Sequence, residues 1–406
     1  MGRVARKRRR WKRKVSARRD GVKTMRALAE INDPDVSVSL IQALIPVGLD
    51  RVNELLQSEV MRLAGPKGEH GKENTRWGSQ WGSVYLADQK IPAQIPRVRN
   101  KTLNEEIPLE SYQKLQRPYC ADEQVFKKLL NGLSMRKYEE SARIVPEVFG
   151  LSASNMSKRF KVAAAARLRR LMTRDLSRYD FVVMFIDGKR FADEGIVIAV
   201  GITIEGEKVM LGLAQMNSEN HRAVEEFFDN LIERGLNFRE SLLFIVDGSK
   251  GIIKAVNRKF KGCALIQRCL WHKRENVVSH LGKRQQAVWR KKLRAAYDKP
   301  NHSEAEAALI KLTKELNEIN PTAAGSLKEG MPDTLTLHKL GLNQILRRSF
   351  STTNCIESVL AQVEQYTQRV DRWRGGAHIQ RWVASGLLEV EPRLKRVYGW
   401  GASSLS

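Results

Sequence analysis

The stretch SLLFIVDGSKG, residues 241–251, places five apolar residues directly before an aspartate and then turns. The apolar run Leu242–Val246 has the length and composition of a buried strand. Asp247 disfavours strands, and the Gly-Ser pair after it is typical of a turn. Asp247 is therefore either a turn residue or a carboxylate placed for chemistry at the edge of a buried sheet. Its neighbours in the fold decide between the two.

Four other strand candidates accompany this one. At residue 181 the spacing of apolar residues changes from a helical to a strand-like period. The five strand candidates are FVVMFID (181–187), IVIAVGITI (196–204), KVMLGLAQM (208–216), LLFIVD (242–247) and CALIQRC (263–269). Glu205-Gly206 predicts a tight hairpin between the second and third strands. Helical patterns separate the third strand from the fourth and the fourth from the fifth. This element order is that of a ribonuclease-H-like core, an α/β fold with a five-stranded mixed sheet.

Two aspartates end strands of this predicted sheet. Asp187 ends the first strand, in FIDGKR, and Asp247 ends the fourth. In a ribonuclease-H-like sheet the first and fourth strands are neighbours, so we expect the two carboxylates to face one another. Two anions that close repel each other unless a cation lies between them, and Mg²⁺ or Mn²⁺ with oxygen ligands meets that need. For either aspartate alone, the alternative is a role in the following turn.

A third carboxylate is expected from a helix that packs on the sheet after the fifth strand. The segment RRSFSTTNCIESVLAQVEQYTQRV, residues 347–370, places Glu357 one turn into such a helix. The alternative is that Asn354 and Glu357, three residues apart, form a pair resembling a capping box. Three carboxylates can hold two metal ions about 3.5–4 Å apart, which activate water or a 3′-hydroxyl and stabilise the leaving oxygen. That is the chemistry of phosphodiester bonds.

The composition indicates a polyanionic partner. The 406 residues include 71 Lys+Arg against 45 Asp+Glu, a formal net charge of +26. Nucleic acid is the first candidate partner, and an anionic membrane surface is the alternative. No apolar run approaches the roughly 18–20 residues of a membrane helix, and the amino-terminal segment lacks the apolar core of a secretory signal. The four cysteines show no disulfide or zinc spacing. We therefore expect a soluble, cytoplasmic, nucleoid-associated protein.

The basic excess is concentrated in an arm, residues 1–26, which carries thirteen Lys or Arg against Asp20 alone. Self-repulsion and few apolar groups predict that this arm is disordered. Its densest run, Arg8, Arg9 and Arg10, is expected to neutralise DNA phosphates with release of counterions. The alternative is a solubilising tail or a localisation signal.

Three regions are expected between the arm and the sheet. Residues 27–64 predict a helical region with an apolar stripe at Val52, Leu55, Leu56, Val60 and Leu63. Residues 65–118 are rich in Gly and Pro and predict a β-hairpin or a linker. Residues 119–179 contain three helical patterns joined by short turns, typical of a helix-turn-helix-like DNA-binding domain. Its third helix would present to a major groove Ser154, Asn155, Lys158 and Arg159. The alternative is a three-helix unit that serves only as a core.

Taken together, the motifs FIDGK, IVDGSKG, QRCLWHKRENV and STTNCIES resemble those of the bacterial Mutator-type insertion-sequence transposases, members of the DDE recombinase superfamily. The resemblance spans most of the chain. It implies that Asp187, Asp247 and Glu357 are catalytic residues that bind two Mg²⁺ or Mn²⁺ ions. It also implies binding to the terminal inverted repeats of an insertion sequence, DNA cleavage there, and strand transfer into target DNA.

The resemblance also divides the carboxyl-terminal part of the chain. The long segment between Asp247 and Glu357 is similar to the α-helical insertion that such enzymes carry before the glutamate helix. The catalytic core is then expected in two parts, residues 180–282 and 346–406, with the insertion at 283–345.

The Cys-x-x-His pair, Cys269 and His272, matches the family's signature after the fifth strand. The resemblance implies that it supports the metal site or contacts the DNA end. This pair alone has too few ligands for a closed zinc site, and the ring of Trp271 between them can stack on an unpaired base. The alternative is a buried thiol and a histidine at the start of a helix.

Basic residues after Glu357 depart from the family's pattern. Relatives often carry them soon after the glutamate, whereas here the first is Arg369, twelve positions on. Contact of this region with DNA is therefore expected from Arg369, Arg372 or Arg374.

Two other functions compete with a DDE transposase: a catalytically inactive, sequence-specific DNA-binding regulator derived from a transposase, and a ribonuclease-H-like nuclease without strand transfer. The intact set of three carboxylates argues against the regulator, and the amino-terminal DNA-binding region argues against the plain nuclease. Because two DNA ends must be brought together, we expect a homodimer or a larger nucleoprotein assembly on double-stranded DNA. No membrane and no small-molecule substrate are expected.

Overall fold

The computed structural model describes residues 34–68, 73–86, 89–116, 121–136, 152–216, 221–238, 240–342 and 344–400. The chain forms two compact units, residues 1–160 and 161–406. The boundary falls inside helix α6 (Ala153–Met172). The basic arm with Arg8, Arg9 and Arg10 lies outside the described residues, as does most of the second predicted helix of the helix-turn-helix-like domain. None of the described helices combines the length and the apolar character needed to cross a membrane.

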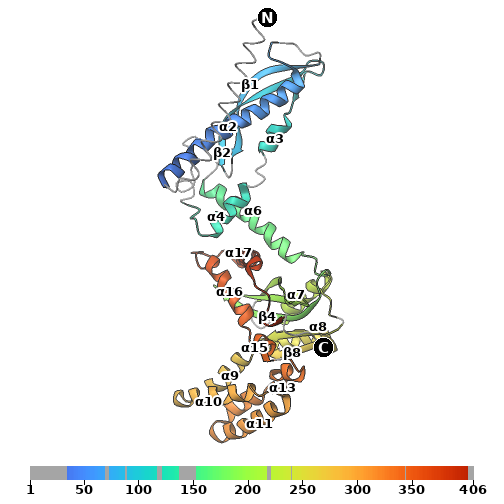
Figure 1. Ribbon diagram of the computed structural model, residues 1–406, viewed down its shortest axis with the longest axis vertical. Coiled ribbons are helices and arrows are strands. Elements are labelled where there is room, and N and C mark those ends of the chain that lie inside the picture. Colours follow the sequence, from blue (N-terminus) through green and yellow to red (C-terminus); the bar gives the residue numbers. More distant parts are fainter. Residues whose placement is uncertain are drawn as a thin grey trace. The chain divides into compact units, whose positions relative to one another are not determined.

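The first unit contains a long helix packed on a β-hairpin (Figure 1). Helix α2 (Pro34–Ala64) contacts β1 (Asn74–Leu86) and β2 (Gln89–Asn100), which pair antiparallel. The short strand β3 (Glu106–Ile107) extends this sheet. The core between helix and hairpin is formed by Val52, Leu56, Val60, Val84, Ile95 and Val98. Leu55, which the periodicity assigned to the apolar stripe, is 48% exposed because the buried positions Val52, Leu56 and Val60 are spaced four residues apart.

Two short helices follow the hairpin, α3 (Glu110–Gln116) and α4 (Ala121–Leu130). Within the first unit, Phe126 of α4 and Phe160 of α6 stack with their ring centroids 5.2 Å apart. This aromatic contact joins the first and third of the helices predicted between residues 119 and 179.

A five-stranded mixed sheet forms the centre of the second unit, in the order β6-β5-β4-β7-β8. Strand β4 pairs antiparallel with β5 and parallel with β7, and β7 pairs parallel with β8. The expectation that the first and fourth strands are neighbours is confirmed. The strand bounds are β4 (Phe181–Phe191), β5 (Glu194–Thr203), β6 (Lys208–Met216), β7 (Leu242–Val246) and β8 (Ala264–Arg268).

The connection from β5 to β6 is the tight hairpin that Glu205-Gly206 predicts. The Thr203 N–H donates to the Glu207 carbonyl at 3.0 Å, and the Thr203 hydroxyl accepts hydrogen bonds from the N–H groups of Glu205 and Glu207. Gly206 has a φ of +76°, and a Cβ there would lie 2.5 Å from Cγ of Trp400. Both the left-handed backbone and the close approach require glycine.

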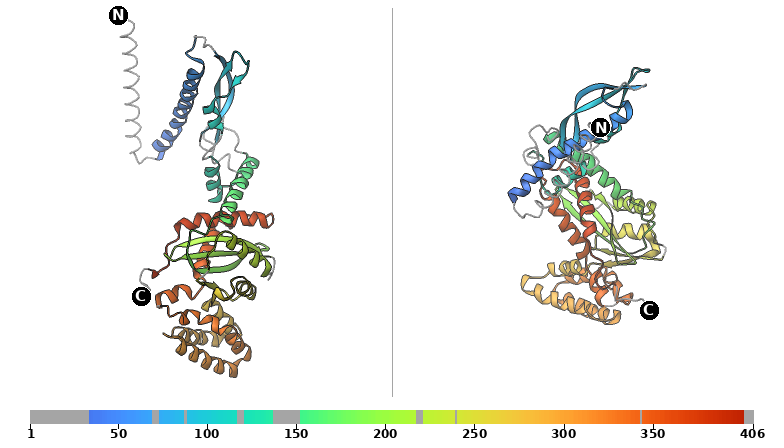
Figure 2. Two further views of the ribbon diagram at one scale, coloured as in Figure 1. Left: turned by 90° about the vertical axis from the view of Figure 1, so that its right-hand side faces the viewer. Right: turned by 45° about the horizontal axis from the view of Figure 1, so that its top comes forward.

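Apolar side chains bury both faces of the sheet. Along β4, Val183 and Phe185 enter one core, whereas Met184 and Ile186 enter the other. Helices α7 (His221–Glu233) and α8 (Lys250–Phe260) complete the Met184 side, and α16 (Asn354–Thr367) and α17 (Gly376–Val390) complete the Val183 side. Figure 2 shows the carboxyl-terminal helices, in orange and red, against the green strands. The α16 helix is therefore fixed against one face of the sheet.

The chain between β8 and α16 is helical. Its helices are α9 (Leu270–Ser279), α10 (Lys283–Tyr297), α11 (His302–Ile319), α12 (Pro321–Lys328), α13 (Met331–Thr334), α14 (Thr336–Lys339) and α15 (Gln344–Phe350). A core of their own includes Trp289, Leu309, Leu316 and Leu327. Two asparagine N-caps start helices here, because the side chains of Asn301 and Asn320 accept hydrogen bonds from the N–H groups of Glu304 and Ala323. Single-turn 3₁₀ helices occur at Lys261–Cys263 and Glu391–Arg393.

Candidate active site

Two aspartates occupy adjacent positions at the two central strands of the sheet, one within β4 and one directly after β7. The parallel register pairs Ile186 of β4 with Val246 of β7, so Asp187 and Asp247 fall at the next pair of opposite positions. Opposite residues of neighbouring strands point to the same face, and side chains alternate along a strand. Because Ile186 enters the core under α7 and α8, this alternation directs Asp187 and Asp247 to the face that α16 covers.

Asp187 lies within β4 rather than at its end, which corrects the sequence prediction. The parallel pairing with β7 stops at Ile186, but the antiparallel pairing with β5 continues to Phe191 and keeps the strand extended. Asp247 directly follows β7, and its Oδ1 accepts a hydrogen bond from the N–H of Ser249 at 2.8 Å. Asp247 therefore stabilises the turn and also stands beside Asp187.

The Asp187 carboxyl is buried and crowded by negative charge. It is 8% exposed, and its pKa is raised to about 6, first by burial and then by the charge of Asp247, with a contribution from Glu357. The N–H of Gly188 donates to Asp187 Oδ1 at 2.8 Å, and this bond and the nearby His272 offset only part of the shift. The site therefore carries an excess of negative charge that a bound cation would neutralise.

Helix α16 carries Glu357 to the same face of the sheet. The helix begins at Asn354, and the fully buried Thr353 is its N-cap residue. The Thr353 hydroxyl donates to Glu357 Oε1 at 2.6 Å, while the Glu357 side chain remains 41% exposed. The alternative of a capping pair between Asn354 and Glu357 is wrong, because Asn354 is already the first helical residue.

The Cys-x-x-His pair lies beside this turn. Cys269 is the buried N-cap residue of α9, and the N–H of Thr353 donates to its Sγ at 3.4 Å. His272 Nδ1 lies 3.3 Å from Thr353 Oγ1, and His272 Nε2 lies 4.0 Å from Glu357 Oε1. The hydrogen bond with Cys269 raises the pKa of His272 to about 9, with contributions from Glu357 and Asp247. His272 is thus a cation at neutral pH next to the carboxylates.

The Cys269 thiol has a pKa below its ordinary value. Burial raises that pKa, but hydrogen bonds with His272 and Thr353 together outweigh the effect of burial. The Thr353 hydroxyl also lies 3.3 Å from Cys269 Sγ. A hydroxyl has one hydrogen, and the short bond to the Glu357 carboxylate is the stronger of the two. Thr353 therefore donates its hydroxyl hydrogen to Glu357, and its oxygen contacts the Cys269–His272 pair.

Thr353 is a residue that the sequence prediction missed. It contacts Cys269, His272 and Glu357, which come from two segments more than 80 positions apart. The available signal was the pair of threonines in STTNCIES, because threonine is a frequent N-cap residue. The pattern alone does not say which of the consecutive polar residues ends up buried against the cysteine.

The other predicted residues near this site occupy more exposed positions. Trp271 is 46% exposed, and its ring centroid lies 4.8 Å from that of His272. Arg369 and Arg372 are exposed and follow the carboxyl end of α16. Arg369 lies about three helical turns along the chain from Glu357, and Arg372 lies three residues farther. The fold thus brings together the three carboxylates and the Cys-x-x-His pair, but places the arginines at the other end of α16.

The residues predicted to read DNA belong to the first turns of α6, in the first unit. Ser154 and Lys158 are exposed, whereas Asn155 and Arg159 are partly buried. Ser152 precedes the helix, and its hydroxyl accepts a hydrogen bond from the N–H of Asn155 at 3.4 Å. Two of the four predicted side chains are therefore presented to solvent.

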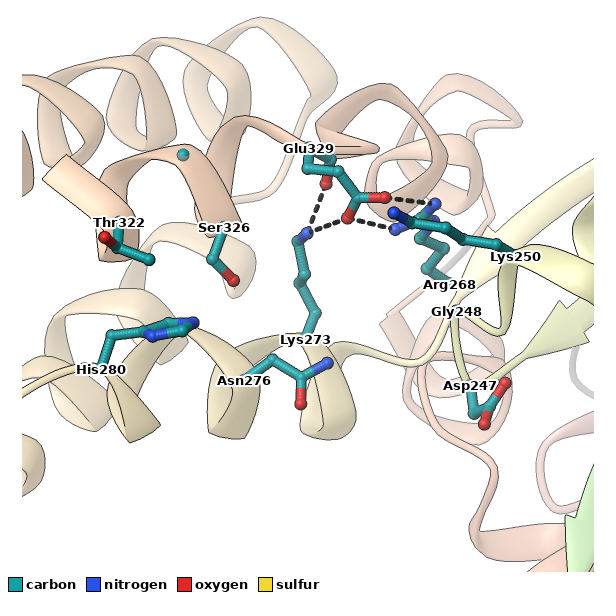
Figure 3. Close-up of a pocket in the computed structure, with 11 residues that line it drawn as sticks. Asp247, Gly248, Lys250, Arg268, Lys273, Asn276, His280, Thr322, Ser326 and Glu329 are labelled. Carbon is teal, nitrogen blue, oxygen red and sulfur yellow. Dashed lines mark hydrogen bonds and ion pairs between the residues drawn. The ribbon is translucent and has the colours of Figure 1, made fainter. Parts of the chain in front are cut away.

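A cleft of about 510 Å³ opens beside Asp247 (Figure 3). At its wall the Glu329 carboxylate accepts hydrogen bonds from Arg268 at 2.7 and 3.0 Å and from Lys273 at 3.0 Å. The bond from Arg268 is the main reason that the pKa of Glu329 falls to about 2. The sequence prediction missed this cluster, because an ion pair between residues 61 positions apart leaves no local pattern.

In the part of the chain that the structure describes, no group of three or more His, Cys, Asp or Glu side chains is arranged so that it could hold a metal ion. The two aspartates are adjacent in register, but the three carboxylates do not converge as a ready-made set of ligands.

Comparisons with known proteins agree with the motifs. The family described as "Transposase, Mutator family" matches residues 17–393. The chain is similar to the transposase for insertion sequence element IS905 of Lactococcus lactis, with 26% identity over 334 residues, 78% of this chain and 81% of that protein. It is also similar to the transposase for insertion sequence element IS256 in transposon Tn4001 of Staphylococcus aureus, with 23% identity over 370 residues, 88% of this chain and 90% of that protein. Since the family match covers most of the sequence, the chain belongs to the Mutator family of transposases.

Proposed function

We propose that this transposase cleaves DNA at the terminal inverted repeats of its own insertion sequence and transfers the strands into target DNA, with Asp187, Asp247 and Glu357 as its active site. The observation that carries the proposal is the position of Asp187 and Asp247, each directly after a residue of the Ile186–Val246 register pair, on the face that the Glu357 helix covers. The raised pKa of Asp187 supports it, because a structural role alone gives no reason to crowd negative charge at a buried position.

We assign the sheet of the second unit and the helices on its two faces to a ribonuclease-H-like core. Supporting this assignment is a mixed sheet whose first three strands are antiparallel neighbours and whose next two run parallel to the first. The two parts of the core are 180–282 and 346–406. The α-helical insertion, 283–345, falls in the helical region that has a core of its own. Residues 119–179 are the DNA-binding domain in this scheme.

The donor atoms of the three carboxylates fit Mg²⁺ or Mn²⁺, which take oxygen ligands. Asp187, Asp247 and Glu357 would hold two such ions, which when bound supply activation of a water or 3′-hydroxyl and charge neutralisation at the leaving oxygen. Such ions would neutralise the excess negative charge around Asp187. Because the side chains are not already converged, binding would draw in the partly exposed Glu357.

Thr353 and His272 would position Glu357. The hydrogen bond from Thr353 occupies Oε1 and leaves Oε2 for an ion. His272, a cation whose Nε2 lies 4.0 Å from Oε1, would hold the Glu357 carboxylate in place by the attraction of opposite charges. The exposed ring of Trp271 is placed to stack on an unpaired base at the DNA end. In this proposal the Cys-x-x-His pair acts on the reaction through the glutamate.

Binding to the terminal repeats would use three basic regions: the amino-terminal arm, the start of α6 and the segment after α16. Lys158 on α6, and Arg369 and Arg372 after α16, are exposed, and together with the arm they account for part of the +26 net charge. Two DNA ends must react together, so the active form would be a homodimer or a larger assembly on double-stranded DNA.

Footprinting on the DNA that flanks its gene, followed by a cleavage assay on the protected sequence, tests this function. We expect protection of inverted repeats at both ends and cleavage there in Mg²⁺ or Mn²⁺. Protection of the repeats with no cleavage or joining in either metal would contradict the proposal and favour the catalytically inactive regulator.

A further inference from the structure

The cleft beside Asp247 lies between helices α9 and α12 (Figure 3). Its walls follow helical spacing on both sides, with residues three or four apart on one face of each helix. The wall residues are Lys273, Asn276 and His280 on the α9 side and Thr322, Gly325 and Ser326 of α12. The cleft is therefore formed by the facing sides of α9 and α12. One end of it lies at Asp247, a proposed catalytic carboxylate.

The lining of the cleft selects the chemistry of its ligand. Every residue that lines it is charged, polar or glycine. Pockets for drug-like molecules or nucleobases have walls of hydrophobic and aromatic side chains, and this lining has no aliphatic residue and no Phe, Tyr or Trp. The ligand that fits such a cleft is hydrophilic and rich in hydrogen-bond acceptors.

Two buried cations form a fixed clamp at the end of the cleft near Asp247. Arg268 is 8% exposed and Lys273 is 4% exposed, and both hold the Glu329 carboxylate. Gly330 has a φ of +63°, and a Cβ there would lie 2.4 Å from Cζ of Arg268, so glycine is required for the guanidinium to lie where it does. An arginine fork that binds a carboxylate through two nitrogens has the geometry that also binds a phosphate.

A third cation stands next to this clamp. Lys250 is the first residue of α8, three positions after Asp247, and in Figure 3 its side chain extends toward Arg268 and Glu329. Within the described part of the chain, Lys250 takes part in no ion pair. Arg268 Nε also lies 3.4 Å from the Asp333 carboxylate. The carboxylates of Glu329 and Asp333 therefore balance the charges of Arg268 and Lys273, whereas Lys250 stands near Asp247 as a third positive charge outside the clamp.

We infer that this cleft holds a phosphodiester group of the DNA strand that passes Asp247. The inference rests on the proposed function, because Asp247 marks the position of the reacting phosphate. The α9 wall from Lys273 to His280 is about 10 Å long, or roughly three nucleotides at the rise of about 3.4 Å per nucleotide of duplex DNA. The held phosphate thus lies within roughly three nucleotides of the reacting one. Lys250 neutralises it, and Asn276 and Ser326 donate hydrogen bonds to its strand.

Binding measurements in EDTA test this inference without catalysis. The probes are a fluorescein-labelled duplex of the element end and an unrelated duplex of equal length, titrated at several salt concentrations. Lys250→Gln is expected to reduce the slope of log K against log salt by about one on both probes, because one phosphate contact is lost. Ser326→Glu, which places a carboxylate in the cleft, is expected to weaken binding at low salt at least about tenfold, an electrostatic cost of about 1.4 kcal/mol.

Lys311→Gln, at an exposed lysine of α11 outside the cleft, is the matched control and should bind like the wild type. Thermal unfolding shows whether each variant is folded; Lys250 is exposed, so its replacement leaves the core intact. A wild-type salt slope in Lys250→Gln would overturn the inference. Failure of the proposed function would instead appear as a wild-type protein that binds DNA but does not cleave it, whatever the slope of the variant.

Discussion

The Thr353 hydroxyl donates a hydrogen bond to Oε1 of Glu357 at 2.6 Å, one helical turn away. Thr353 is fully buried, and the same oxygen lies 3.3 Å from Cys269 Sγ and from His272 Nδ1. The Cys-x-x-His pair therefore reaches the glutamate through Thr353, in addition to the direct approach of His272 Nε2 to Oε1 at 4.0 Å. This gives the motif a physical role beside the carboxylates that does not require it to bind a metal ion itself.

Replacement of Thr353 tests this connection. Thr353→Val keeps the size of the side chain but removes the donor, so we expect joining to fall about 10–100-fold and the Mn²⁺ concentration at half-maximal activity to rise by a similar factor. Thr353→Ser keeps the hydroxyl and should stay near the wild type. The measurements are joining rates over a series of Mn²⁺ concentrations and the affinity for Mn²⁺ without DNA. A valine variant with unchanged Mn²⁺ affinity and rate would show that Thr353 does not position Glu357.

Asp187 should destabilise the folded protein at neutral pH. Its pKa is about 6 in the fold and 3.8 ordinarily, so the folded state binds more protons than the unfolded state between these values and stability falls as pH rises through this range. Asp187→Asn removes this cost and is expected to raise the free energy of unfolding above pH 6 by up to about 3 kcal/mol. The gain should vanish below about pH 3, where the carboxyl is protonated in both states.

Denaturant unfolding of the wild type and Asp187→Asn in EDTA, once above about pH 6 and once below about pH 3, measures this difference in the free energy of unfolding. A gain of equal size at low and high pH would mean that burial and the charge of Asp247 do not cause it. Mg²⁺ or Mn²⁺ should reduce the advantage of the asparagine variant, because the ions neutralise the carboxylate they bind.

The sheet and two of its carboxylates could be predicted from the sequence because strands buried on both faces read as continuous apolar runs. Such runs at β4 and β7, each followed or interrupted by an aspartate, locate Asp187 and Asp247 without any knowledge of contacts. Their adjacency followed from the element order. The extension of β4 to Phe191 could not be predicted, because it depends on the pairing with β5.

The contacts that support the site could not be predicted in the same way. Thr353 meets Cys269 only because the fold brings the start of α16 next to the start of α9. The bond from Arg268 to Glu329 joins β8 to the residue after α12. Interactions of this kind depend on tertiary packing and leave no periodic signal. The predicted DNA contacts of the arm, α6 and Arg372 stay predictions.

Glu329 should stabilise the contact between strand β8 of the sheet and the helical region that follows it. Glu329→Gln removes the charge that faces buried Arg268 and Lys273, so we expect a loss of about 1–3 kcal/mol in the free energy of unfolding. Glu315→Gln, at the more exposed pair with Lys292, should change it by less than about 1 kcal/mol. Thermal and denaturant unfolding compare the two, and equal losses would contradict the importance of burial.

The central claim is that Asp187, Asp247 and Glu357 form a metal-dependent active site for DNA joining. Its most direct test is a strand-transfer assay with the element end, run in Mg²⁺, in Mn²⁺ and in EDTA, on the wild type, Asp247→Asn and the control Asp193→Asn in an exposed turn. We predict joined product from the wild type and Asp193→Asn in either metal, none in EDTA, and none from an Asp247→Asn protein that still binds the DNA. Joining by Asp247→Asn at the wild-type level would contradict the assignment.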